Sequence, residues 1–144
     1  MNIKLEYLKH SDLKAYKTLL DDVLGEGSPL VDYQAHYKED HPSVKVVVAK
    51  KDDEIVGTLT FVLMDTFTSP LDPKIEFSNF AIIPSARGGD AATLLMRFVA
   101  DFAKEHGYKS IVVNCLAKAS RAHQFYKKMG FEHLDTTRFQ LKVK

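Results

Sequence analysis

Hydrophobic and polar positions alternate, or recur at helical spacing, along most of the first half of the chain. Residues 3–8 alternate and predict a strand. Residues 11–24 carry apolar side chains at helical spacing and predict an amphipathic helix with Ser11 as its N-cap. Residues 31–40 predict a second, shorter helix. Residues 43–65 predict two antiparallel strands joined at the polar sequence KKDDE.

The second half predicts a parallel strand, helix, strand unit. Residues 75–83 form the first strand, which Pro84 ends. The helix that follows carries an apolar stripe at Ala91, Leu94, Leu95, Phe98, Val99, Phe102 and Ala103, and it ends at Gly107. Residues 109–115 form the second strand, which is expected to be parallel to the first because a helix of this length joins them.

The chain ends in a further helix and one or two predicted strands. The helix closes at Gly130, and residues 131–144 supply the strands. The resulting order, β-α-α-β-β-β-α-β-α-β(-β), predicts a mixed α/β fold with a central mixed sheet of six to seven strands and helices on both faces. Without repeats or linker-like composition, residues 1–144 are predicted to form a single domain.

Composition narrows the classes of function. A net charge of +1 gives no field that would recruit nucleic acid, so no nucleic-acid partner is expected. No apolar run is long enough to span a bilayer, and the N-terminus does not resemble a signal peptide. Cys115, the one cysteine, lies in an apolar run and is predicted to be a buried thiol. We therefore expect a soluble, cytoplasmic protein without a membrane partner, and the spacing of its histidines predicts no metal site.

The turn between the strand at 75–83 and the next helix has the features of an anion site. A strand that enters a helix through two glycines aims backbone N–H groups and the positive end of the helix dipole at one point. Arg87 adds charged donors, and Gly88 and Gly89 allow close approach of a ligand. The lysine of a Walker loop and the three spaced glycines of a Rossmann fingerprint are both missing from this segment.

The segment NFAIIPSARGGDAATLLM resembles the acetyl-CoA motif of the GNAT superfamily of acyl-CoA-dependent N-acetyltransferases, Arg/Gln-x-x-Gly-x-Gly/Ala. Downstream, FYKKMGF is similar to the closing Tyr-x-x-x-Gly-Phe signature of that family. Together these motifs cover residues 75–131. Two positions depart from the family pattern: Asp90 replaces a glycine, and Ala119 stands where an asparagine is frequent.

Asp90 allows two interpretations. Its side chain can turn back onto the N–H groups of Ala92 or Thr93 and cap the helix, which would stabilise the helix by about 1 kcal/mol. Alternatively, the carboxylate competes with phosphate for the same donors and weakens binding. Capping is the interpretation that we favour.

The resemblance implies acetyl-CoA as acyl donor and assigns residues to it. Contacts to the pantetheine arm fall on Ala81, Ile82 and Ile83, and contacts to the pyrophosphate on Arg87, Gly88, Gly89, Asp90, Ala91 and Ala92. Tyr126 matches the tyrosine that protonates the departing thiolate in the family. Acceptor recognition would fall on residues 22–40, 65–74 and 133–138, whose acidic side chains suit a cationic amine.

An amine with a lysine-like pKa near ~10.4 must lose a proton before it can attack. Glu76 is the candidate base, because strict alternation places it on the same strand face as Ile82. Ser78 and Asn79 could instead orient a water molecule. His123, one turn before Tyr126, is more simply a half-exposed helix residue.

Three hypotheses therefore remain. The first is an enzyme that transfers acetyl from acetyl-CoA to a small-molecule or peptide primary amine by direct attack. The second is a non-catalytic acyl-CoA-binding or interaction module, for which Asp90 is the main indication. The third is a nucleotide-binding domain. A homodimer stays open, since dimers are frequent among proteins of this family.

Overall fold

The computed structural model describes residues 2–64 and 72–143. The chain divides into two compact units, Met1–Val113 and Asn114–Lys144.

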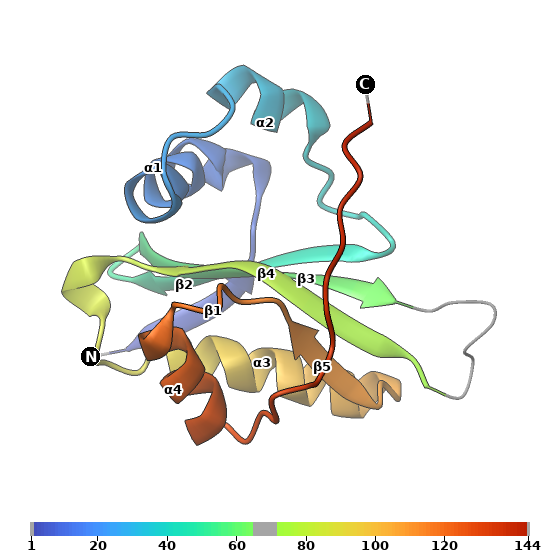
Figure 1. Cartoon of the computed structure of the whole chain (residues 1–144). Coiled ribbons are helices and arrows are strands. Elements are labelled where there is room, and N and C mark those ends of the chain that lie inside the picture. Colours follow the sequence, from blue (N-terminus) through green and yellow to red (C-terminus); the bar gives the residue numbers. More distant parts are fainter. Residues whose placement is uncertain (1, 65–71, 144) are drawn as a thin grey trace. The chain divides into compact units, whose positions relative to one another are not determined.

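A five-stranded sheet forms the centre of the first unit (Figure 1). Its strands are β1 (Ile3–Tyr7), β2 (Val44–Lys51), β3 (Glu54–Met64), β4 (Lys74–Ile82) and β5 (Ser110–Val113), and they lie side by side in chain order. The pairs from β1 to β4 are antiparallel, and β5 is parallel to β4. The predicted hairpin and the predicted parallel unit are both confirmed.

The hairpin between β2 and β3 turns at two aspartates. Asp52 and Asp53 have φ angles of 52° and 65°, which is the left-handed region. Two successive residues of positive φ are what a two-residue hairpin turn requires, and aspartate tolerates that conformation better than most side chains. The polar KKDDE sequence therefore turns at its two aspartates.

Helices cover both faces of the sheet in the first unit, as predicted. Figure 1 shows α1 (Leu13–Leu24) and α2 (Leu30–His36) on one face and α3 (Ala91–His106) on the other. The buried positions of α1 are Leu13, Tyr16, Leu19 and Leu20, and those of α3 are Ala91, Leu95, Met96, Val99 and Ala103. Helix α3 ends at His106, and the φ of 80° at Gly107, the next residue, confirms the predicted C-terminal glycine.

The predicted N-cap of the first helix is wrong. A 3₁₀ turn, His10–Asp12, precedes α1, and Asp12 is the residue at the N-cap position. The Asp12 carboxylate accepts a hydrogen bond from the backbone N–H of Lys9 at 3.1 Å. Ser11 is displaced from the cap because this turn adds residues before the helix begins.

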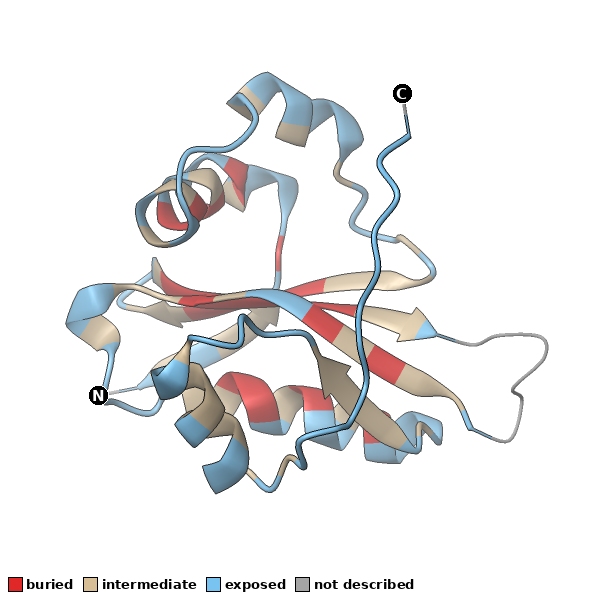
Figure 2. Cartoon of the chain, in the orientation of Figure 1, coloured by how far each residue is buried: buried red, intermediate tan, exposed pale blue. Residues whose placement is uncertain are grey.

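Figure 2 shows the buried residues of the first unit on the sheet and on the inner sides of its helices. Phe61 and Phe77 lie under α3, where the ring of Phe61 contacts that of Phe102 with centroids 5.2 Å apart. On the opposite face, Val46, Val48 and Ala81 pack with the buried side of α1. The two apolar layers hold β4 between them, and β4 leads into the glycine turn.

The second unit contains one helix, α4 (Ser120–Lys128), which closes at Gly130 as predicted. The predicted strands in residues 131–144 are wrong over the described part of that segment, since 131–143 form neither helix nor strand. Phe139, Leu141 and Val143 alternate as in a strand but are about nine-tenths exposed. A strand needs a hydrogen-bonded neighbour, and no strand is present among the described residues of this unit. The described sheet therefore has five strands instead of six to seven.

Cys115 also differs from its prediction, because its side chain is exposed. Strand β5 ends at Val113, so Cys115 follows the strand instead of lying within it. None of the helices described here has the length and apolar character that crossing a bilayer requires.

Candidate functional site

The turn between β4 and α3 contains a short 3₁₀ helix, Pro84–Ala86, and then Arg87 and two glycines. Some of its backbone N–H groups are used internally: those of Ala86, Arg87 and Gly89 donate to carbonyl oxygens three residues earlier, at 3.0 to 3.4 Å. Gly88 has a φ of 84°, and a Cβ atom there would meet nothing within 4 Å. Glycine is therefore needed at this position for the backbone conformation.

The remaining donors of the turn lie at the start of α3. The first bond of the helix runs from the N–H of Leu94 to the carbonyl of Asp90 at 2.9 Å, so the N–H groups of Ala91, Ala92 and Thr93 have no acceptor within the helix. Among the described residues, the backbone N–H groups of Gly88 and Asp90 also donate to no other backbone group. The turn thus presents several unused donors at the positive end of a helix dipole.

Asp90 does not cap α3 with its side chain, so the favoured interpretation of this residue is wrong. Its φ and ψ of −90° and −10° are already helical, whereas a side-chain cap normally needs an extended backbone at this position. The exposed carboxylate therefore leaves the N–H groups of Ala92 and Thr93 available.

Arg87 is tied to the end of β4. Its Nε donates a hydrogen bond to the carbonyl of Ile82 at 3.1 Å, although the side chain is exposed. This bond holds the guanidinium at the junction of strand and turn. The contact could not be predicted from the sequence, because it depends on how the 3₁₀ helix folds the chain back.

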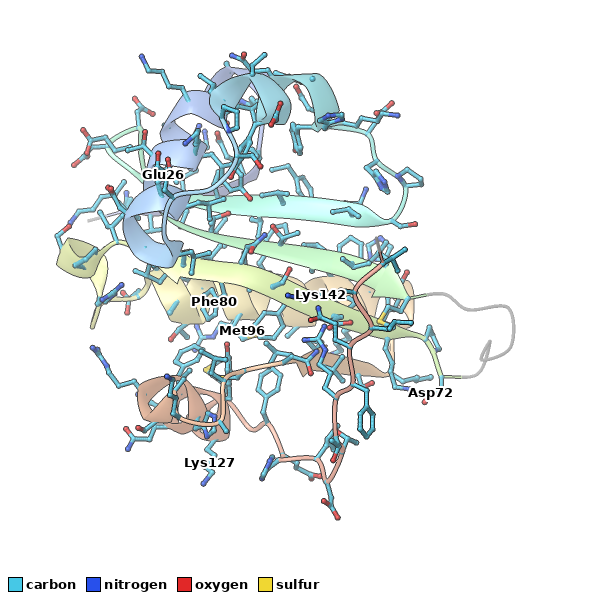
Figure 3. All side chains as sticks on the ribbon, turned by 45° about the horizontal axis from the view of Figure 1, so that its top comes forward. Glu26, Asp72, Phe80, Met96, Lys127 and Lys142 are labelled. Carbon is cyan, nitrogen blue, oxygen red and sulfur yellow. The ribbon has the colours of Figure 1, made fainter. Side chains whose placement is uncertain are left out.

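Strand β4 extends past the end of its pairing with β5. The parallel ladder ends at the pair Phe77 and Val113, whereas β4 continues to Ile82. Ala81 and Ile82 therefore lie outside that ladder while they remain paired with β3 through Thr58 and Gly57. Figure 3 labels Phe80 on β4 and Met96 on α3, the two elements that the glycine turn connects.

A β-bulge interrupts β4 and changes which side chains share a face. Thr58 pairs with Ala81 and Thr60 with Ser78, so Asn79 and Phe80 stand opposite one residue, Leu59. Asn79 adopts a φ of 47°, in the left-handed region. Bulges are frequent next to active sites, where they redirect side chains.

The bulge overturns the predicted face of Glu76. Through the register with β3, Glu76 shares its face with Ser78 and Ala81, and Ile82 lies on the opposite face. Glu76 is half-buried and lies inside the β5 ladder, opposite Val112. Ser78 and Asn79 are exposed, and they lie just beyond the last pair of the β5 ladder, Phe77 and Val113. This exposed stretch of β4 is the second part of the candidate site.

Tyr126 belongs to the second unit, on α4. Its ring contacts those of Phe125 and Phe131, with centroids 5.7 Å and 5.5 Å away. Burial, with a smaller effect from the charge of Cys115, raises the pKa of Tyr126 to about 12. The phenol is therefore protonated throughout the neutral range.

His123 ties the start of the second unit to its helix. Its Nε2 lies 2.9 Å from the carbonyl oxygen of Leu116, which orients the imidazole toward the loop before α4. Ala119, at the N-cap of α4, makes no side-chain cap bond. The His123 side chain thus links the loop before α4 to the helix, because the N-cap residue supplies no side-chain hydrogen bond. No group of three metal-ligating side chains was found among the residues that the structure describes.

A cavity of about 610 Å³ lies in the first unit at the other edge of the sheet, where β1 ends and β2 begins. Tyr7, Tyr37 and Phe102 are among its lining residues, and none of the lining residues belongs to β4 or to the glycine turn. This cavity is separate from the candidate site.

Comparison with known proteins identifies the family. Residues 11–131 match the Acetyltransferase (GNAT) family, so the chain belongs to this family. An uncharacterized N-acetyltransferase of Mycobacterium tuberculosis (strain H37Rv) is 31% identical over 107 residues, which are 74% of this chain and 64% of that protein. N-acetylaspartate synthetase of Homo sapiens is 32% identical over 63 residues, 44% of this chain and 21% of that protein. The chain thus spans less than two thirds of the length of these curated relatives.

Solved structures agree with this fold. AAC(6′)-Iy, in complex with the bisubstrate analog CoA-S-monomethyl-acetylneamine, superposes with a TM-score of 0.84 at 16% identity, and the match covers 100% of both chains. The aminoglycoside acetyltransferase meta-AAC0020 from an uncultured soil metagenomic sample, in complex with trehalose, gives a TM-score of 0.83 at 19% identity, over 99% of this chain and 97% of that chain. At these identities the likeness concerns the fold.

Proposed function

We propose that this protein transfers an acetyl group from acetyl-CoA to a primary amine by direct attack of the amine. The observation that carries the proposal is the set of unused N–H donors at the start of α3, next to Arg87, in a chain of the GNAT family. Backbone donors at a helix N-terminus suit a diphosphate, because they bind negative charge without needing a charged side chain.

The residues present fit such a donor molecule. Gly88 leaves the turn without a Cβ atom, so a diphosphate can approach the backbone closely. Arg87 supplies charged N–H groups besides the Nε bonded to Ile82. Ala81, Ile82 and Ile83 are the residues whose backbone would bind the pantetheine arm, and Ala81 and Ile82 lie outside the β5 ladder. Bound acetyl-CoA would supply the activated acyl group.

Tyr126 is the proposed general acid. With a pKa of about 12 its phenol keeps its proton at neutral pH, which a group that protonates a departing thiolate requires. A thiol of ordinary pKa near ~8.5 is a stronger acid than this phenol, so the transfer of a proton from Tyr126 to the thiolate is uphill in free energy. Tyr126 gives its proton to the thiolate as the bond between sulfur and the acetyl carbon breaks, the thiol carries that proton away, and a proton from solvent then restores the phenol.

The proposed base acts on the exposed stretch of β4. Glu76, Ser78 and Ala81 share one face, so a water molecule held beside Ser78 would lie on the side of the sheet that carries the Glu76 carboxylate. Glu76 takes the proton of the ammonium group directly or through that water. Through Ala81 this face packs against α1 and α2, and residues 22–40, which include α2, are among the segments assigned to acceptor recognition.

The acceptor is proposed to be a cationic primary amine. Residues 22–40 of the assigned recognition segments include Glu26, which Figure 3 labels, and Asp32. Residues 65–71 of the second segment lie outside the described part of the chain. One structural neighbour, the aminoglycoside acetyltransferase meta-AAC0020, was solved in complex with sisomicin, so we include aminoglycosides and other polyamines in the first panel to be tested.

Calorimetry with acetyl-CoA, free coenzyme A and ATP tests the donor site, and thiol release over an amine panel tests turnover. Preference for ATP over acetyl-CoA would identify a nucleotide-binding domain. Binding of acetyl-CoA without thiol release on any amine would favour the non-catalytic module, for which Asp90 remains the sequence indication.

Tyr126→Phe tests the general acid, and Tyr7→Phe on the partly exposed β1 is the matched control. Loss of the hydroxyl is expected to lower kcat by about 100-fold or more while the affinity for acetyl-CoA is unchanged. Equal turnover in Tyr126→Phe and in the control would remove Tyr126 from the reaction.

A further inference from the structure

Two threonines lie next to each other on one face of β3, and their hydroxyl groups have different surroundings. Thr58 and Thr60 are both buried under α1, with 0% and 8% of their surface exposed. The Thr58 hydroxyl donates to the carbonyl of Val47 at 2.9 Å. The buried Thr60 Oγ1 has no hydrogen-bond partner among the described residues. Such a group is costly to retain, so it calls for an explanation.

Tyr16 is the polar residue of α1 that approaches Thr60. Burial raises the pKa of Tyr16, and the neighbouring Thr60 hydroxyl opposes that effect. The two hydroxyls interact, but their geometry falls short of a hydrogen bond. Tyr16 therefore covers Thr60 without satisfying it.

The cross-strand neighbour of Thr60 is Ser78, on the exposed stretch of β4. Directly opposed residues in an antiparallel pair share a face with their Cβ atoms about 5 Å apart, a distance across which Thr and Ser hydroxyls can bond. Ser78 is exposed and immediately precedes the bulge at Asn79. The Ser78 hydroxyl is therefore on the same face as Thr60 Oγ1 and is its cross-strand neighbour.

We infer that Ser78 binds the acceptor amine and that Thr60 positions Ser78 for it. When Ser78 donates its O–H to Thr60 Oγ1, its oxygen lone pairs point to the exposed side of β4 and accept an N–H of the acceptor. Thr60 is then a positioning residue. Its hydroxyl orients Ser78 when the acceptor is bound and does not stabilise the fold. This inference rests on the proposed function, because it assigns the acceptor side of the same site.

Substitution by valine, which has the shape of threonine without the hydroxyl, separates the two roles. Thr60→Val is expected to melt at or above the wild-type temperature, because no bond is lost in the free protein. Thr58→Val, the matched control, is expected to lower the melting temperature by several degrees, because its bond to Val47 is lost. A Thr60→Val variant that melts as low as Thr58→Val would overturn the inference.

Kinetics supply the second test. Thr60→Val and Ser78→Ala are each expected to lower kcat/KM for the amine about 3- to 10-fold, with no change in KM for acetyl-CoA. The double variant is expected to have the same kcat/KM for the amine as the less active of the two single variants, because Thr60 acts only through Ser78. Fully additive losses, or a Thr60→Val enzyme with wild-type kcat/KM, would overturn it.

Tyr16→Phe separates this role from a contact within the core. If Thr60 acted by holding Tyr16, Tyr16→Phe would reproduce the kinetic loss of Thr60→Val, and that result would count against Ser78. Absence of thiol release by the wild-type protein on every amine would contradict the proposed function instead. The melting comparison of the two threonine variants still decides whether the Thr60 hydroxyl serves the fold.

Discussion

The side chain of Arg87 returns to the strand that precedes it, where its Nε donates to the carbonyl oxygen of Ile82 at 3.1 Å. The bond fixes one end of a flexible side chain at the point where β4 gives way to the glycine turn. Its other guanidinium N–H groups can then face a ligand at a lower entropic cost, because part of the side chain is already ordered.

Arg87→Ala is expected to weaken coenzyme A binding by about 10- to 100-fold, because hydrogen bonds to a charged group contribute about 1.5–3 kcal/mol. Arg87→Lys keeps the charge but has no Nε fork, and it should recover only part of the affinity. Calorimetry with coenzyme A measures both. Equal affinity of the wild-type and alanine variants would show that Arg87 does not contact the ligand.

Asp90→Asn is expected to tighten coenzyme A binding up to about fivefold at low salt, because it removes a negative charge beside a diphosphate. The gain should shrink as salt is added. The free energy of unfolding should change by less than about 1 kcal/mol, since no side-chain cap bond is lost. A large fall in melting temperature would restore the capping interpretation, and weaker binding would mean that the carboxylate assists the ligand.

Alkaline unfolding is expected to depend on Tyr37 and Tyr126. Burial raises the pKa of both to about 12, and carboxylates near Tyr37 add to the effect. Between pH 10 and 12 the unfolded chain loses these protons more readily than the folded one. The contribution of the two phenols to the free energy of unfolding is therefore fully present below pH 10 and declines as the pH rises to 12. Denaturant titrations across this range measure the decline.

Tyr37→Phe should flatten that decline, at a cost in stability at pH 7. The cost arises because the Tyr37 hydroxyl donates to the carbonyl of Leu8 at 2.6 Å. An unchanged pH profile in this variant would mean that the phenol titrates alike in the folded and unfolded chains.

Gly57→Ala is expected to destabilise the fold by about 1–3 kcal/mol through overpacking. A Cβ atom there would lie 2.7 Å from Cδ1 of Ile82 and 3.2 Å from Cδ1 of Leu95. Ile82→Val removes one of these methyl groups, so the double variant should be more stable than the sum of the two single changes predicts. Denaturant unfolding of the three variants tests this, and strict additivity would contradict the packing shown here.

Most of the fold could be predicted from the sequence, because strands and amphipathic helices of ordinary length dominate it. The stripe on α3 and the hairpin at Asp52 and Asp53 are local patterns that tertiary contacts reinforce. The failure in residues 131–143 is of another kind. Alternation there indicates a strand, but a strand forms only where a neighbour supplies hydrogen bonds, and no local pattern states that.

The site was predictable in position but not in orientation. Alternation assigns Glu76 and Ile82 to one face, whereas the left-handed residue Asn79 adds a residue to β4 and reverses the faces beyond it. The sequence offers only a weak signal, because asparagine tolerates such a conformation without requiring it. Thr60 has no signal at all, since its missing bond is known only from its surroundings.

The donors at the start of α3 are main-chain atoms, which every residue but proline carries. Mutation can therefore alter nearly all the side chains around them while the chemical groups that would receive the nucleotide stay in place. Proteins that share 16–19% of their residues with this chain keep its architecture, so these backbone donors can persist while the side chains around the proposed acceptor site vary.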